Sequence, residues 1–186
     1  MYYKKKYFKY KKKYLELKKK QTGGNRKHYF IFDSDISEKN KNLTLKYLFD
    51  NRGWLSKNYY FEETLDENLA DSKIYFKSTD FINKKYHFAD YLQNLSITDK
   101  SEDLTKVYFN LNNWNNPPKE FVCKDNRLET YRAYLIQHEF GHAIGYDHPK
   151  IPKNELELKN CNPMLQQTKY TEPYCKANPW ISNYKK

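Results

Sequence analysis

The stretch HEFGHAIGYDH, from His138 to His148, constrains the fold of this chain more than any other segment. His138 and His142 stand four positions apart, so on a helix both imidazoles project from one face. Gly145 carries no Cβ, which allows the backbone to turn sharply and to return His148 toward the first two histidines. The chain must therefore build a helix that stops at Gly145 and a turn that folds back beside it.

Three imidazoles that converge on one point suit zinc, which then keeps a fourth position for water. Two histidines at this spacing are often accidental surface or core residues, but the full HExxHxxGxxH pattern on a readable helix is far more specific. We therefore predict one catalytic Zn2+ bound by His138, His142 and His148. Glu139, one residue round the helix, is adjacent to this site and can hold a water rather than the metal.

Hydrophobic periodicity predicts strands and helices that alternate in an α+β domain. Strands are expected at 28–34, 73–78 and 106–111, with a weaker candidate at 58–62. Helices are expected at 38–51 and 127–144, and the second helix carries the histidines. Asn126 and Glu129 are spaced like a capping box at its start. The segment 112–118, NNWNNPP, is expected to be a turn or loop, and the region after the second helix is expected to be irregular.

The formal net charge of +11 is confined to the start of the chain. Residues 1–27 hold 12 lysines and arginines against one acid, so the body, 28–186, is formally neutral. This tail has tyrosines and a leucine at helical spacing, which is compatible with a basic amphipathic helix that binds an anionic membrane surface or nucleic acid. We favour the other interpretation, a solvated and mostly disordered arm of mutually repelling charges, because tyrosine is a weaker membrane anchor than leucine or tryptophan. We expect a tail at 1–27 and one domain at 28–186, divided into an upper part, 28–145, and a lower part, 146–186.

The sequence contains no recognisable targeting signal. No apolar run approaches the roughly 20 residues that span a bilayer, and the basic N-terminus lacks the apolar region of a signal peptide. We therefore expect no transmembrane segment, and the compartment stays open. The three cysteines are too few for a disulfide framework.

The histidine stretch resembles the zinc-binding signature of the metzincin metallopeptidases. In that clan a methionine turn lies beneath the metal, and CNPMLQQT supplies Met164 sixteen residues after His148. Three further segments are similar to those of one uncharacterised metzincin-like bacterial family: VYFNLNNW (107–114), MLQQT (164–168) and CKANPW (175–180). The second half of the chain carries this resemblance, and the first half follows it in the order of its elements.

The resemblance implies a metzincin-like (zincin) fold, with a twisted mixed sheet, an active-site helix and a small irregular C-terminal subdomain. It implies a zinc-dependent endopeptidase in which Glu139 activates the zinc-bound water. The peptide or protein substrate would lie extended in a cleft and pair with the edge strand of the sheet. The segment 107–111 is either a strand near that cleft or a buried central strand.

Some features depart from the metzincin pattern or stay open. The charged insert 149–160 separates His148 from the methionine turn, and Gln166 stands where some metzincins have a tyrosine ligand. Cys161 and Cys175 bracket the turn, as a disulfide or as a free pair.

Two other functions are compatible with the sequence. One is a nucleic-acid-tethered protease that uses the basic tail. The other is a catalytically idle metzincin-fold binding module. Intact Glu139 and three intact histidines favour an active enzyme, since degenerate relatives usually lose a ligand or the base.

Overall fold

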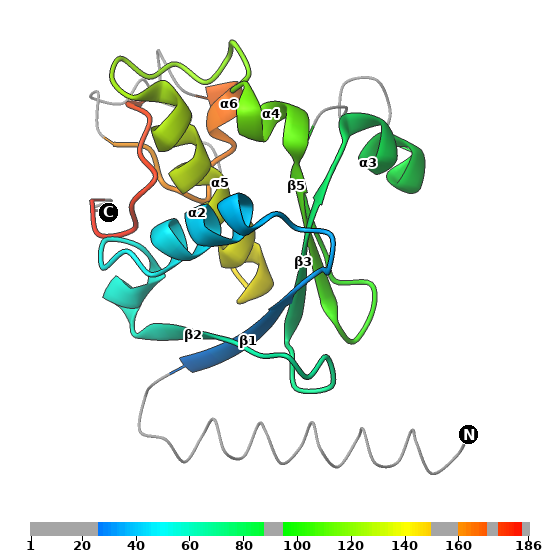
Figure 1. The fold of residues 1–186 in the computed structure, drawn as a ribbon. Helices are drawn as coiled ribbons and strands as arrows, with labels where there is room; N and C mark the ends of the chain where they lie inside the picture. The colour runs from blue at the N-terminus through cyan, green and yellow to red at the C-terminus, as the bar shows by residue number, and fades with distance from the viewer. Residues whose placement is uncertain (1–25, 88–94, 150–159, 171–174, 184–186) are drawn as a thin grey trace.

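The computed structural model of the chain describes residues 26–87, 95–149, 160–170 and 175–183. They form an α+β fold with one mixed five-stranded sheet and several helices (Figure 1). The tail up to residue 25 and most of the charged insert lie outside these ranges, so the expectations for both stay predictions. Arg26 and Lys27, counted with the tail in the sequence, belong to the first strand. Within the described ranges, no helix has the length and apolar character that crossing a bilayer requires.

The sheet has the strand order β2-β1-β3-β5-β4. Its strands are β1 (Arg26–Phe32), β2 (Tyr59–Glu63), β3 (Ser72–Lys77), β4 (Ile97–Asp99) and β5 (Thr105–Asn110). β2, β1, β3 and β5 are parallel, whereas β4 is antiparallel to β5. The four strands predicted from the sequence are present. The sequence left the segment 107–111 either near the cleft or in the centre of the sheet. Most of it lies in β5, which is internal, and β4 forms the edge.

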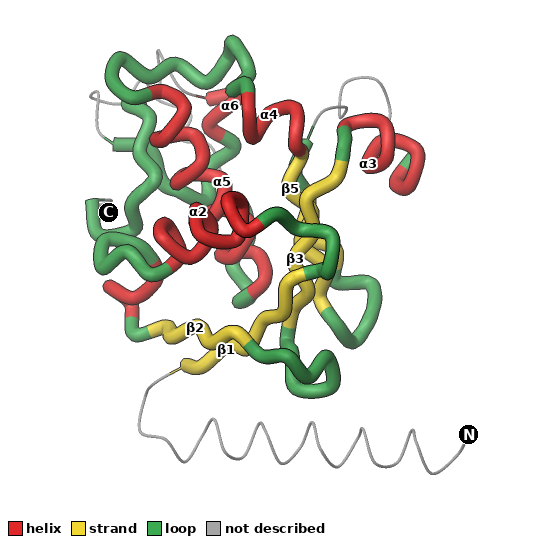
Figure 2. Tube along the Cα trace, viewed as in Figure 1, coloured by secondary structure: helices red, strands yellow, loops and turns green. Residues whose placement is uncertain are grey.

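The helices are α2 (Glu38–Leu48), α3 (Thr79–Tyr86), α4 (Leu111–Asn115), α5 (Arg127–Ala143) and α6 (Gln167–Tyr170), with a 3-10 turn, η1 (Trp54–Lys57). α2 and α5 lie on one face of the sheet, and α3 lies beside β5 on the other side (Figure 1). The residues after α5 run mainly as loops, with α6 as a short helical turn (Figure 2). The expected helix at 38–51 therefore ends three residues early, and the irregular C-terminal part is confirmed.

Aromatic side chains fill the core between the sheet and the two helices. The Phe140 ring of α5 meets the rings of Phe30 and Phe61 edge to face, with centroids 5.7 and 5.4 Å apart. Farther along, the Phe76 and Trp114 rings meet in the same way at 4.9 Å. Edge-to-face contacts suit the opposed partial charges of ring faces and edges. A few large rings thus bury much apolar area in a chain of low mean hydropathy.

Two local predictions are wrong. The segment expected to be a turn at 112–118 begins with helix α4, because the Asn110 side chain caps this helix by accepting hydrogen bonds from the main-chain N–H groups of Asn112 and Asn113. The capping box at the start of α5 does not form. Asn126 has a left-handed backbone with φ of 47°, and its side chain makes no capping hydrogen bond.

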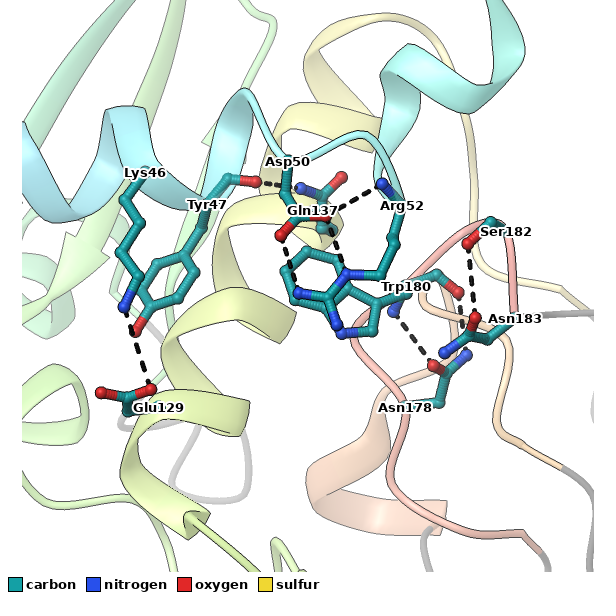
Figure 3. Close-up of polar contacts among 10 residues, drawn as sticks. All are labelled: Lys46, Tyr47, Asp50, Arg52, Glu129, Gln137, Asn178, Trp180, Ser182 and Asn183. Atoms are coloured by element: carbon teal, nitrogen blue, oxygen red, sulfur yellow. Dashed lines mark hydrogen bonds and ion pairs between the residues drawn. The ribbon is translucent and has the colours of Figure 1, made fainter.

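A buried amide joins α5 to the segment that follows α2. Gln137 is fully buried; its Nε2 donates to the carbonyl of Tyr47 at 2.7 Å, and its Oε1 accepts from the main-chain N–H of Trp54 at 3.2 Å. Figure 3 shows Gln137 reaching the Tyr47 carbonyl beside Arg52, whose guanidinium stacks on the Trp180 ring at 4.0 Å. One side chain therefore satisfies two buried main-chain groups and fixes how α5 lies against α2.

We expect Gln137→Leu to lower the free energy of unfolding by about 1–3 kcal/mol, because the apolar side chain leaves the buried Trp54 N–H without its partner and leaves the Tyr47 carbonyl only the 3.4 Å hydrogen bond from the N–H of Asp50. Urea denaturation measures the change. The matched control is Gln166→Leu, at a half-buried position whose side chain makes no hydrogen bond to the described residues, and it should change stability by less than about 0.5 kcal/mol. Equal losses in the two variants would contradict the role of Gln137.

Candidate metal centre

Helix α5 ends in a turn that brings the third histidine back to the first two. Beyond its last residues, the N–H of Gly145 donates to the carbonyl of His142 at 3.0 Å, and the N–H of Tyr146 donates to that of Gly141 at 2.9 Å. This pair of bonds is a Schellman motif, which needs a positive φ at the residue after the cap. Gly145 has φ of 101° and supplies it. The glycine stop predicted from the sequence is present.

An aromatic contact holds the segment that follows Gly145 in this turn. The Tyr146 ring lies on the Trp54 ring with centroids 4.4 Å apart, and the Tyr146 hydroxyl accepts from that of Tyr59 at 3.4 Å. Trp54 is itself fixed, since its Nε1 donates to the carbonyl of Gln137 at 2.7 Å. The turn that carries His148 is thereby anchored to η1 and β2.

The three histidines converge on one point. The Nε2 atoms of His138, His142 and His148 are 3.1, 3.1 and 3.2 Å apart pairwise. A carbonyl can only accept, so the Nδ1 atoms of His138 and His142 must donate to the carbonyls of Pro163 and Tyr146, each at 2.8 Å. Since a neutral imidazole carries one proton, the Nε2 atoms of these two rings present lone pairs. Two lone pairs at this distance repel unless a cation lies between them.

This geometry fits a tetrahedral metal ion. Zn–N bonds of about 2.0–2.1 Å at tetrahedral angles place two ligand nitrogens about 3.3 Å apart, close to the observed separations. Burial, together with the nearby His142, lowers the pKa of His138 to about 3, and burial lowers the pKa of His142 as well. Both rings are therefore neutral, as metal ligands must be. The His138, His142 and His148 cluster can bind one metal ion.

The C-terminal segment packs under the histidines. A Cβ on Gly141 would come within 2.3 Å of Met164 Sδ and 2.6 Å of Trp54 Cζ2, so only glycine allows these side chains to approach the helix. Met164 is 3 % exposed, and the residue before it, Pro163, supplies the carbonyl that orients His138. The methionine predicted from its position in the sequence thus lies against the histidine helix.

Several bonds lock this segment in place. The Tyr134 hydroxyl of α5 donates to the carbonyl of Leu165 at 3.0 Å and accepts from the N–H of Gln167 at 3.1 Å. Gln167 and Asn178 exchange two hydrogen bonds between side chain and main chain, of 2.7 and 2.9 Å. A disulfide joins Cys161 to Cys175, the pair that the sequence left open between a bridge and free thiols. The C-terminal part therefore stays folded against α5.

Glu139 occupies the same cleft as the histidines. It is 4 % exposed, and its Oε2 accepts a hydrogen bond of 2.7 Å from the hydroxyl of Thr98 on β4. Burial raises the pKa of Glu139 to about 7, and the Thr98 hydrogen bond opposes the rise. A carboxylate with little access to bulk water is the kind of group that enzymes use to move protons.

The cleft is large enough for a segment of peptide. Its volume is about 990 Å³, and it is lined by residues around β4, by α5 from Tyr131 to His142, and by Gln166 and Thr168 from the C-terminal part. Gln166, which departs from the tyrosine of some metzincins, therefore lies at the cleft wall. Ligand pockets in proteins commonly have volumes of about 300–1,000 Å³.

A family model described as "Protein of unknown function (DUF3152)" matches residues 35–178. The chain belongs to this family. The matched region of this DUF3152 member contains the three histidines, Glu139 and Met164, and it extends through the first half of the chain, where the resemblance rested on the order of elements alone. Neither the curated proteins nor the solved structures provided a match.

The sequence indicated the histidines and Glu139 but missed the residues that hold them. Thr98 lies on a three-residue strand, too short for alternation to be read. Gln137 and Tyr134 precede the motif at positions where a polar or aromatic residue is ordinary on a helix. The spacing of Tyr134 before His138 was the one available signal, because residues four apart share a helix face.

We expect the DUF3152 member to bind one zinc ion per chain, and His138→Ala, His142→Ala or His148→Ala each to weaken binding more than about 100-fold. Loss of a residue that only supports a ligand costs about 10–100-fold, and loss of the ligand itself costs more. Metal analysis after dialysis against graded chelator measures this. The control is His87→Asn, an exposed histidine with a left-handed backbone that asparagine tolerates. Zinc retention in all three variants equal to that of the control would contradict the site.

We expect Gly141→Ala to lower the free energy of unfolding by about 1–3 kcal/mol, because its Cβ overlaps Met164 and Trp54. Helix propensity alone predicts a change in the opposite direction, a gain of about 1 kcal/mol. Thermal unfolding of the metal-free protein gives the sign. An unchanged or raised midpoint would show that Met164 does not pack against the helix.

Proposed function

We propose that this chain is a zinc-dependent endopeptidase with a metzincin-like fold. The observation that carries the proposal is the convergence of three imidazole Nε2 atoms within 3.2 Å of one another, in a cleft that also contains a buried carboxylate. Three protein ligands leave the fourth position of a zinc ion open, which is the pattern of catalytic rather than structural sites.

His138, His142 and His148 would hold the ion. When bound, zinc polarises a substrate carbonyl and lowers the pKa of a coordinated water toward about 7. The carbonyls of Pro163 and Tyr146 keep the Nδ1 protons in place, so that Nε2 of His138 and His142 faces the cleft as a lone pair. Such outer contacts orient the ligand rings and raise their basicity.

Glu139 would serve as the base and then as the acid. Its carboxylate accepts a proton from the attacking water and transfers that proton to the nitrogen of the leaving amine, so the peptide C–N bond breaks without releasing an amide anion. Burial keeps bulk water from competing for the carboxylate. Glu139 follows a ligand directly in the sequence, yet its carboxylate is hydrogen-bonded to Thr98 on β4, which supports a role separate from metal binding.

The edge of the sheet suits an extended substrate. β4 is antiparallel to β5, borders the cleft and pairs with no other described strand. A peptide can add to such an edge by main-chain hydrogen bonds, which recognise the backbone irrespective of side chains. The order of sheet, histidine helix, glycine turn and methionine segment supports the metzincin-like fold.

We expect Glu139→Gln to abolish peptide cleavage while the protein stays folded and retains zinc, because the amide keeps the shape of the side chain but cannot accept the proton. Cleavage of a diverse peptide library, followed by mass spectrometry with and without chelator, measures the activity. The matched control is Glu129→Gln on the same helix, whose carboxylate is exposed and lies 3.9 Å from Lys46. This control should cleave like the wild type.

Comparable cleavage by Glu139→Gln, or cleavage that survives removal of the metal, would contradict the proposed mechanism. A zinc-loaded wild-type protein that cuts no peptide in the library and no unfolded protein would contradict the proposed activity itself.

A further inference from the structure

The hydroxyl of Thr98 contacts Glu139 at two points. Thr98 Oγ1 lies 2.7 Å from the carboxylate Oε2 and 3.1 Å from the main-chain carbonyl oxygen of the same residue. Thr98 is the middle residue of β4, and its register partner on β5 is Val107. The contact therefore joins the edge strand of the sheet directly to the histidine helix, at the wall of the cleft.

We propose that Thr98 is a positioning residue that holds the Glu139 carboxylate in one orientation for catalysis; this inference rests on the proposed peptidase function. The hydroxyl has one proton, and the 2.7 Å contact is the shorter of the two, as expected for a bond to a charged acceptor. Oε1 has no hydrogen-bond partner among the described residues. The two carboxylate oxygens thus receive different tasks: Oε2 is anchored, and Oε1 is left for the attacking water.

An anchor is needed because a glutamate side chain has three rotatable bonds. Proton transfer requires the carboxylate within hydrogen-bond reach of the water, and a misplacement of about 1 Å can cost about 100-fold in rate. The His138 and His142 rings are fixed by main-chain carbonyls, whereas Thr98 donates the single hydrogen bond that the Glu139 carboxylate accepts within the described residues. Removal of this hydroxyl should therefore affect turnover rather than metal binding.

The placement of this anchor on β4 has a consequence for substrate binding. The strand that holds the carboxylate is also the edge strand along which we expect the peptide to lie. A peptide that pairs with β4 would steady a short strand that is held on one side only by β5. The same short strand, β4, would then both bind the substrate and orient the carboxylate of the base.

The test is steady-state kinetics of Thr98→Val, which has the same shape but no hydroxyl, beside Thr98→Ser, which restores the hydroxyl. We expect Thr98→Val to lower kcat about tenfold or more, the size that loss of one hydrogen bond to a charged group predicts, with KM and zinc content unchanged. Thr98→Ser keeps the hydroxyl and should retain kcat within about threefold of the wild type. A change of that size is smaller than the effect expected from the loss of one hydrogen bond to a charged group. If Thr98 had a purely structural role, Thr98→Val would change KM or zinc content as well as kcat.

The matched control is Thr44→Val in α2. Thr44 is buried, and its hydroxyl donates to the carbonyl of Asn40 at 2.8 Å, so this variant loses a threonine hydroxyl bonded to main chain at a position that does not line the cleft. It should leave kcat unchanged. Equal kcat in Thr98→Val and the wild type, or equal losses in Thr98→Val and Thr98→Ser, would overturn the proposal.

A second readout does not depend on turnover. In metal-free protein, we expect Thr98→Val to lower the thermal midpoint more in the wild-type background than in Glu139→Ala, since the carboxylate is absent from the latter. Equal shifts in the two backgrounds would overturn the contact between Thr98 and the carboxylate. Absence of cleavage by the wild type would instead overturn the peptidase function, and the coupling would still decide whether Thr98 holds Glu139.

Discussion

The hydrogen bond from His138 Nδ1 to the carbonyl of Pro163 joins the two parts of the chain that the candidate site needs. It fixes the tautomer of the most buried histidine, and it can form only if the C-terminal segment lies against α5. The close approach of Met164 to Gly141 meets the same requirement, because a helix residue without a side chain leaves room for the sulfur. Where the C-terminal segment docks therefore decides where the first ligand points.

That docking is expensive in conformational entropy, since the segment has little regular structure to hold it. The chain compensates with specific links: the Tyr134 hydroxyl bonds main chain on both sides of Gln166, the side-chain amide of Gln167 bonds both the N–H and the carbonyl of Asn178, and a disulfide closes the loop between Cys161 and Cys175. Polar side chains bonded to main chain replace the helix or sheet ladders that this segment lacks. Their burial explains why a region so irregular can support a site that requires fixed distances.

Much of the fold and of the histidine site could be predicted from the sequence, because local rules govern both. Two histidines four apart share a helix face, a glycine permits the positive φ after the helix, and alternation marks the longer strands. Thr98, Gln137 and the cap by Asn110 could not be predicted, because tertiary contacts decide them. Thr98 meets Glu139 only through the pairing of β4 with β5, and Gln137 meets Tyr47 and Trp54 only once α5 lies on α2. A tertiary contact also accompanies the failed capping box at Asn126. The Arg127 side chain donates to the carbonyls of Pro117, Pro118 and Phe121 and so ties the loop before α5 to the start of the helix.

The convergent lone pairs of His138 and His142 are a conflict built into the folded protein. In water each Nε2 would accept a hydrogen bond, whereas in the fold the two face one another at 3.2 Å while their Nδ1 protons are held elsewhere. Such an arrangement costs stability, and natural proteins tolerate a cost of this kind mainly at functional sites. A cation removes the cost, so its binding adds to the stability of the turn and the C-terminal segment as well as completing the site. Metal affinity and the docking of the turn and of the described C-terminal segment are therefore coupled through the same two imidazoles.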